Sequence, residues 1–193
     1  MNPARNARWL SVSALALAVF ISNASAYSQT PADTADAQVR KFDTCQLAVF
    51  NAPEFDPIRP HIPKNVFQAT AEQLADTSLP TDDEIRAILL LHPRSRVCYD
   101  ELLRALSRSA PSLAVGFARQ ITEMQNSLVD LLQRKQGWGA HLQRGKAASI
   151  ARRAEQAANR VAGEDTSQQQ AALSDALKEF ERAEASFDSL PSP

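Results

Sequence analysis

Apolar residues recur at intervals of three and four along most of this chain, and that spacing restricts the fold more than any other feature. The pattern is clearest at 111–136, where one stripe repeats at intervals of four, three, four and three, and Gly137 follows as an expected helix end. Such a stripe lies along one side of an α-helix, whereas a half-buried strand alternates residue by residue. No segment alternates over a convincing length, so we predict an all-α fold. The stripe consists of Phe117, Ile121, Met124, Leu128 and Leu131.

Capping and helix-breaking residues set the limits of the earlier helices. A helix is expected at 35–50, followed by a loop with four prolines at 53–63, since each proline removes a backbone donor. Thr70 and Thr81 are each followed three residues later by Gln or Glu, which is the capping-box pattern that begins a helix. Pro93 is expected to break or restart the helix that begins after Thr81.

Two further stripes with heptad spacing occupy the last third of the chain. Each repeats at intervals of three, four, three and four, and a short polar turn at 163–167 separates them. Two helices joined by so short a loop pack antiparallel. We therefore predict a helical hairpin at 138–190, after a disulfide-stapled helical domain at 35–137. The seam of the hairpin would join Ala147, Ile150, Ala154, Ala157 and Val161 to Leu173, Ala176, Phe180, Ala183 and Phe187.

The two helices of this predicted hairpin carry opposite charge. Residues 134–162 hold seven Lys or Arg and one acid, whereas 164–188 hold seven acids and two basic residues. The basic residues have two interpretations, since they either face the acidic helix or form a surface for a partner. An acidic protein is favoured over anionic lipid, because a mostly alanine face inserts poorly into a bilayer. The candidate partner surface consists of Arg144, Lys146, Arg152, Arg153 and Arg160.

The first 26 residues have the three regions of a secretory signal peptide. Arg5 and Arg8 make its start positive, 10–21 is an apolar run, and Ala24-Ser25-Ala26 is a small-residue cleavage site. The apolar run is shorter than the about 20 residues that span a bilayer, so a cleaved signal is favoured over a retained anchor. We predict export to the periplasm or the medium, with 27–34 as a disordered leader and without stable membrane insertion of the mature chain.

Cys45 and Cys98 are the only two cysteines, and both lie in the part expected to be exported. An even count in an oxidising compartment favours a disulfide, and both cysteines fall on helical stripes that can face one core. The alternative is a pair of free buried thiols. A disulfide that closes the loop from 45 to 98 would contribute about 4 kcal/mol in the chain-entropy model. A catalytic thiol is not expected, because nothing places a histidine beside either sulfur.

The stretch QGWGAHLQRGK ends in Gly-Lys, as phosphate-binding loops do. Those loops leave four residues between the glycines and continue with Ser or Thr. Here five residues separate Gly139 from Gly145, and Ala147 stands where the hydroxyl is needed. We therefore predict a helix–helix corner without a nucleotide site. The alternative function for this corner is a small ligand pocket lined by Trp138 and His141.

Several short motifs follow one another in a recognisable order, namely Cys45, Pro53-Glu54-Phe55, Gln73-Leu74-Ala75-Asp76, Pro80-Thr81-x-x-Glu84, Cys98 and Trp138-Gly139. This order resembles a family of uncharacterised exported helical proteins of proteobacteria. Members of that family often carry an acid and an Asn after the Trp/Tyr-Gly corner, where this chain has Ala140 and His141. The resemblance covers about residues 40–145. It implies export and a disulfide-stapled helical domain, and it implies no activity.

The rest of the chain contains no motif for catalysis, metal binding or a cofactor. The three histidines lack metal-ligand spacing, and no nucleophile motif is present. The formal net charge of −1 is unlike the basic surplus of nucleic-acid-binding proteins. We therefore predict a non-enzymatic interaction or scaffold module of the cell envelope, with a protein partner and no cofactor. The alternative is a small-ligand-binding protein with a pocket between the Pro-rich loop and Trp138.

Overall fold

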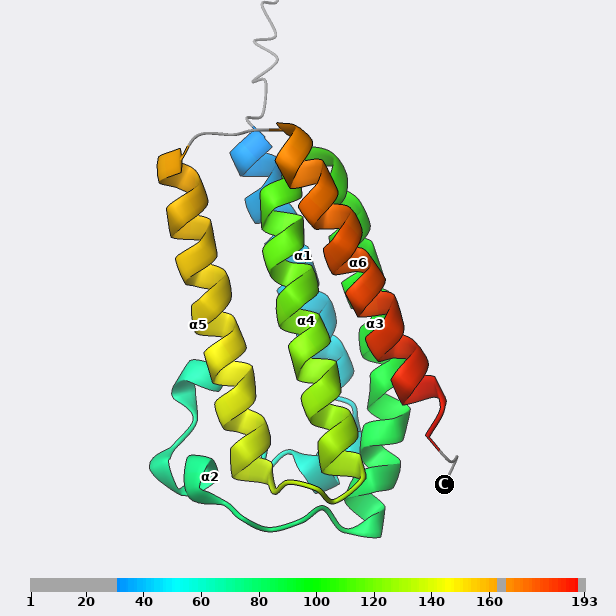
Figure 1. Ribbon diagram of the computed structural model, residues 1–193. Coiled ribbons are helices and arrows are strands. Elements are labelled where there is room, and N and C mark those ends of the chain that lie inside the picture. Colours follow the sequence, from blue (N-terminus) through cyan, green and yellow to red (C-terminus); the bar gives the residue numbers. More distant parts are fainter. Residues whose placement is uncertain (1–30, 163–165, 191–193) are drawn as a thin grey trace, which may run out of the picture.

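The computed structural model describes residues 31–162 and 166–190, and every regular element in this part of the chain is a helix (Figure 1). The predicted all-α class is thereby confirmed. The long helices are α1 (Pro31–Phe50), α3 (Asp82–Ser109), α4 (Pro111–Leu132), α5 (Trp138–Ala162) and α6 (Thr166–Asp188). The short elements between α1 and α3 are η1 (Pro53–Ile58), η2 (Val66–Gln68) and α2 (Ala71–Ala75).

The long helices form two layers (Figure 1). In the front layer α4 lies between α5 and α6, and α1 and α3 lie behind it. Helix α4 packs along both α5 and α6, while α1 packs along α3. The short helix α2 lies at one end of the bundle, against the start of α5. Helix α4 is therefore the central element, and the other helices are arranged around it.

The structure corrects the predicted packing of the last two helices. Helices α5 and α6 are consecutive, but they pack on opposite sides of α4 instead of along one another. The predicted stripe of α6 is buried, and its members Leu173 and Phe180 join a cluster with Leu106 of α3 and Phe117 of α4. These partners offer large apolar side chains, which bury more area than the alanine stripe of α5 would.

A second buried cluster joins elements on both sides of the predicted domain boundary. Its members without exposed surface are Phe55 and Ile58 of η1, Ile88 of α3, Leu131 of α4 and Trp138 of α5. Because these residues form one cluster, 35–137 and 138–190 are not separate domains. The predicted stapled domain and hairpin are parts of a single bundle.

Both predicted capping boxes are present. Thr70 Oγ1 accepts a hydrogen bond from Gln73 N at 3.1 Å, and Gln73 Oε1 accepts one from Thr70 N at 3.1 Å. At the start of α3, Glu84 Oε2 accepts from Thr81 N at 2.7 Å, while Thr81 Oγ1 accepts from Glu84 N. These local signals position the beginnings of α2 and α3 as the sequence indicates.

Helix α3 continues through Pro93, so the predicted break is wrong. A proline removes the hydrogen bond to the residue four positions earlier and usually interrupts a helix. Here tertiary contacts hold the helix on both sides of the proline. The His92 ring stacks on Phe187 of α6 with centroids 3.5 Å apart, and Cys98 is bonded to α1.

Helix α4 ends four residues earlier than predicted. Arg134, with φ 54°, takes the left-handed conformation that glycine usually adopts at a helix end. Lys135 N donates to Asp130 O at 2.9 Å, which is the long-range bond of a Schellman motif. Arg134 Nε donates to Pro80 O at 3.1 Å. A tertiary contact thus keeps an arginine in the position where Gly137 was expected to act.

Helix α1 begins at Pro31, so the second half of the predicted leader at 27–34 is helical. Proline is favoured in the first turn of a helix, and the buried Ala35 already belongs to the core. The predicted signal peptide at 1–26 lies outside the described residues. None of the described helices combines the length and the apolar character that crossing a bilayer requires.

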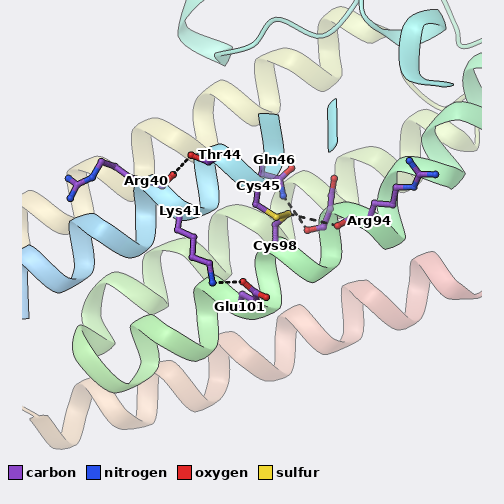
Figure 2. The surroundings of a disulfide bond; sticks show 9 residues. Arg40, Lys41, Thr44, Cys45, Gln46, Arg94, Cys98 and Glu101 are labelled. Atoms are coloured by element: carbon purple, nitrogen blue, oxygen red, sulfur yellow. Dashed lines mark hydrogen bonds and ion pairs between the residues drawn. A yellow bond between two sulfur atoms is a disulfide. The ribbon is translucent and has the colours of Figure 1, made fainter. Parts of the chain in front are cut away.

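Cys45 of α1 and Cys98 of α3 form the predicted disulfide, with their Cα atoms 5.9 Å apart (Figure 2). An ion pair lies one turn away, where Lys41 Nζ is 2.9 Å from Glu101 Oε2. The alternative of two free thiols is excluded. The disulfide therefore joins the two long helices that lie behind α4.

Candidate functional site

The Gly-Lys stretch forms a corner between α4 and α5, where two backbone segments cross closely. A Cβ atom on Gly137 would lie 2.7 Å from the Thr77 carbonyl carbon, and one on Gly139 would lie 2.5 Å from Leu74 O. Gly139 N also donates to Asp76 O at 2.7 Å. The two glycines are therefore explained by this crossing, which also supplies hydrogen-bond acceptors for the first amides of α5.

Trp138 lies at the centre of this corner and has no exposed surface. The His61 ring from the Pro-rich segment stacks on its indole, with centroids 4.5 Å apart and planes 9° apart. His61 Nδ1 is 2.9 Å from Asp76 Oδ2, and His61 Nε2 is 2.9 Å from Glu84 Oε1. Hydrogen bonds from Ser78, and secondarily from His61, lower the pKa of the Asp76 carboxyl. His61 therefore ties the Pro-rich segment to α3 and to α5.

His141 lies on another side of Trp138, with the ring centroids 6.5 Å apart. Its Nδ1 is 2.9 Å from Ser127 Oγ, and that oxygen accepts a hydrogen bond from Gln136 Nε2 at 2.8 Å. Burial, and to a smaller extent the charge of Arg144, lowers the pKa of His141 to about 4. The ring is therefore neutral near pH 7, and its Nδ1 can accept a hydrogen bond from the Ser127 hydroxyl.

A neutral histidine that is hydrogen-bonded to a serine can activate the serine hydroxyl as a nucleophile. Ser127, however, has no exposed surface, so a substrate cannot reach its hydroxyl in this arrangement. The corner brings Trp138 and His141 together, as predicted for a ligand pocket. The His61 ring and the Ser127 side chain occupy the space beside them. The contacts of this corner therefore join α4, α5 and the Pro-rich segment.

The basic residues predicted to form a partner surface on α5 are directed toward other parts of this protein. Arg144 forms ion pairs with Glu123 and Asp130 of α4, at 2.8 and 2.7 Å. The Arg153 guanidinium lies over the Phe67 ring of η2, 4.0 Å from its centroid. Neither residue meets the acidic helix α6, because α5 packs on α4. The predicted basic surface is thus largely used within the bundle.

Arg152 is held in the same way. Its guanidinium lies 4.3 Å from the centroid of the Phe117 ring, and its Nε donates to Gln120 Oε1 at 2.5 Å. Burial lowers the pKa of this guanidinium. Lys146 is half-buried, and the side chain of Arg160 lies outside the described part of the chain. Three of the five residues, Arg144, Arg152 and Arg153, are therefore engaged within the bundle.

The predicted seam of α5 faces solvent. Ile150 is 52 % exposed, and Ala147, Ala154 and Ala157 are exposed as well, while the Val161 side chain lies outside the described residues. A surface helix normally turns its apolar stripe toward the core. In α5 the predicted stripe instead lies on the exposed side of the helix. The prediction that it is buried against α6 is wrong.

A buried polar cluster between α3, α4 and α6 was missed from the sequence. Glu184 is 3 % exposed, and its Oε2 lies 2.9 Å from Arg96 Nε. Gln125 Nε2 donates to the other carboxylate oxygen, and His92 Nε2 is 3.5 Å from that oxygen. Burial, together with this carboxylate, raises the pKa of Tyr99 to about 12. In the sequence, this glutamate follows a residue of the apolar stripe of α6. A solvent-exposed glutamate would occur in the same place, so the spacing did not indicate its burial.

An open groove of about 370 Å³ lies between α4 and α6. Its lining is polar and of mixed charge, with Arg119 and Glu123 from α4 and Glu179 and Arg182 from α6. Pockets for small molecules are mostly apolar and enclosed. The groove therefore has the character of an ordinary solvated surface between two helices.

Comparison of the chain with protein-family models, with curated proteins and with solved structures found no match. The resemblance to a proteobacterial family of exported helical proteins therefore stays a prediction. Among the features above, the solvent-facing apolar stripe of α5 departs furthest from the usual pattern of a helical bundle.

Proposed function

We propose that this protein is an exported, non-enzymatic helical protein that acts as an interaction or scaffold module of the cell envelope. Its docking surface is the outer face of α5. The observation that supports this proposal is the orientation of α5, whose apolar stripe points to solvent while the stripe of α6 is buried. The outer face of α5 consists of Ala147, Ile150, Ala151, Ala154, Ala157 and Ala158.

Contiguous exposed apolar residues favour association, because docking removes their area from water. Small alanine side chains let a second helix approach closely, and Ile150 can enter a hole between the side chains of such a helix. Lys146 lies beside the stripe on the same helix. Its charge favours a partner with an acidic residue beside its own apolar stripe.

The disulfide supports the exported location, because disulfides persist in oxidising compartments and are rare in the cytosol. We expect the exported protein to begin at Tyr27, after the Ala-Ser-Ala site. Amino-terminal sequencing of protein recovered from the periplasm or the medium tests this. Recovery of the uncleaved chain from the cytosol would contradict the proposed location.

The docking surface is tested by substitution and not by truncation, because removing α6 would also remove buried residues of the core. We would compare the protein with a double variant, Ile150→Glu and Ala154→Glu, after cross-linking in the intact envelope. The matched control is Ala171→Glu, at an exposed alanine of α6. A partner that is retained by the protein and by the control, but lost in the double variant, supports the proposal. Equal recovery with all three proteins contradicts it.

A further inference from the structure

The His61 side chain is held on three sides, and both nitrogens of its ring take part. Its Nδ1 lies 2.9 Å from Asp76 Oδ2, and its Nε2 lies 2.9 Å from Glu84 Oε1. One face of the same ring is stacked on the indole of Trp138. A single side chain of the Pro-rich segment thus meets the end of α2, the start of α3 and the start of α5.

The local fold leaves one oxygen of each carboxylate to face this ring. Asp76 Oδ1 accepts a hydrogen bond from Ser78 N at 2.8 Å. Glu84 Oε2 accepts one from Thr81 N at 2.7 Å. The remaining oxygens, Asp76 Oδ2 and Glu84 Oε1, are those that meet His61. Hydrogen bonding by Ser78 also lowers the pKa of the Asp76 carboxyl, which keeps this group ionised at neutral pH.

The charges around His61 are therefore negative. Trp138, which covers one face of the ring, carries no charge, and His141 beside that indole is neutral near pH 7. In the described part of the chain, neither Asp76 nor Glu84 forms an ion pair with a lysine or an arginine. A positive charge on the His61 ring is thus the compensation that this site offers to the two carboxylates.

An ionised carboxylate can only accept hydrogen bonds, so each of the two contacts needs a hydrogen on the ring nitrogen. A neutral imidazole carries one such hydrogen, and its second nitrogen would turn a lone pair toward a carboxylate. We infer that His61 is a pH-sensitive latch, which its imidazolium form closes on Asp76 and Glu84 and which loosens when the ring loses a proton. Histidine ordinarily changes its charge between about pH 5 and 8, so the latch operates in this range.

Loosening is confined to the part of the Pro-rich segment that follows Ile58. Ile58 has no exposed surface and anchors the segment, and Gln73 Nε2 donates to Pro60 O at 3.0 Å whatever the charge of the ring. The neutral ring keeps a hydrogen bond to only one carboxylate, so it withdraws more readily from the indole and uncovers one face of Trp138. The latch therefore couples pH to the covering of Trp138, and it does not depend on a partner at the outer face of α5.

The test is nuclear magnetic resonance on the complete exported protein with its disulfide intact. At the acid end of the range both ring nitrogens of His61 should carry a hydrogen, and at the alkaline end only one. The amides of His61 and Ile62, which both donate to Ile58 O, report the loosening. After correction for the intrinsic effect of pH on exchange, their protection should fall about tenfold across the range, which is the effect of losing one hydrogen bond to a charged group. The amide of Ala110, at the far end of α3, is the internal control and should keep its protection.

Glu84→Gln is the matched variant, because glutamine also completes a capping box. Its amide can donate to the Nε2 atom of a neutral ring whose Nδ1 donates to Asp76, so the latch stays closed without the charge. The fall in protection should therefore disappear in Glu84→Gln, and Asp76→Asn should act in the same way from the other side of the ring. Protection that does not change with pH in the original protein would overturn the inference. A single hydrogen on the ring at the acid end, or a fall in protection that persists in both variants, would overturn it as well.

Discussion

Glu184 is an ionisable residue almost completely enclosed by three helices. Removing a carboxylate from water is unfavourable unless charged and hydrogen-bonding partners replace the solvent. Arg96 and Gln125 supply those partners from α3 and α4. We expect the glutamate to restrict α6 to one register against both helices, because an apolar stripe alone specifies the register less strictly.

Replacing Glu184 by alanine should destabilise the protein by about 3 kcal/mol, because the partners of the carboxylate are left unpaired beside a cavity. The free energy of unfolding is measured in urea. Glu181→Ala, at an exposed position of the same helix, should change it by less than about 0.5 kcal/mol. Equal effects of the two substitutions would show that the buried pairing contributes little.

His141 makes stability depend on pH. Its pKa is lowered from 6.5 to about 4 in the folded protein, so the unfolded chain takes up a proton that the folded protein does not bind. The free energy of unfolding should therefore fall as the pH decreases from 6.5 to about 4, by about 3 kcal/mol in total from this residue. Urea unfolding at several pH values in this range measures the effect. In His141→Gln this part of the pH dependence should be absent, and an unchanged slope would contradict the assignment.

The start of α5 is positioned by backbone contact. Residues 74–78 cross the helix so closely that Gly139 has no space for a side chain. A methyl group on Gly145, further along the same helix, would have Val66 Cγ2 as its nearest neighbour, at 3.9 Å. The two glycines of one helix therefore have different roles, although the sequence presents both in the same short stretch.

Gly139→Ala should destabilise the protein by about 3 kcal/mol, because the new methyl group meets backbone atoms that cannot rotate away. Gly145→Ala should stabilise it by about 0.5–1 kcal/mol, because alanine favours the helix and the contact is an ordinary one. Thermal unfolding of both variants provides the comparison. Similar destabilisation by both substitutions would show that the crossing is not the reason for Gly139.

At the scale of the whole molecule, the disulfide joins α1 to α3 across a sequence separation of 53 residues. The core also includes Ala35 of α1, with Val39 and Phe42 packed against it. The covalent bond restricts the unfolded chain, and these apolar contacts act in the folded state. Both contributions keep the first helix in the bundle.

Replacing both cysteines by serine should lower the free energy of unfolding by about 4 kcal/mol, which is the chain-entropy estimate for a loop of this length. Urea unfolding with and without a reducing agent measures this difference. The reducing agent should destabilise the original protein and leave the double variant unaffected. A loss below about 1 kcal/mol would mean that the unfolded chain is already restricted without the bond.

Local patterns in the sequence were sufficient for the helices themselves. Intervals of three and four identified the apolar faces of α4 and α6, the two capping boxes marked the starts of α2 and α3, and the cysteine count indicated the disulfide. Each of these signals depends on residues within a few positions of one another or on the chemistry of one residue type. The sequence by itself therefore determined the all-α class and most helix positions.

Only the tertiary structure decided which faces meet. Burial depends on the area that each candidate neighbour offers, and α4 offers α6 more apolar area than the alanine stripe of α5 does. That competition left the stripe of α5 in solvent, where the sequence had indicated a seam. Other tertiary contacts direct the basic residues of α5 toward α4 and η2. Tertiary contacts also accompany the continuation of α3 through Pro93 and enclose Glu184. These outcomes depend on contacts between segments that are distant in the chain. The local spacing of residues in the sequence does not indicate which distant segments will meet.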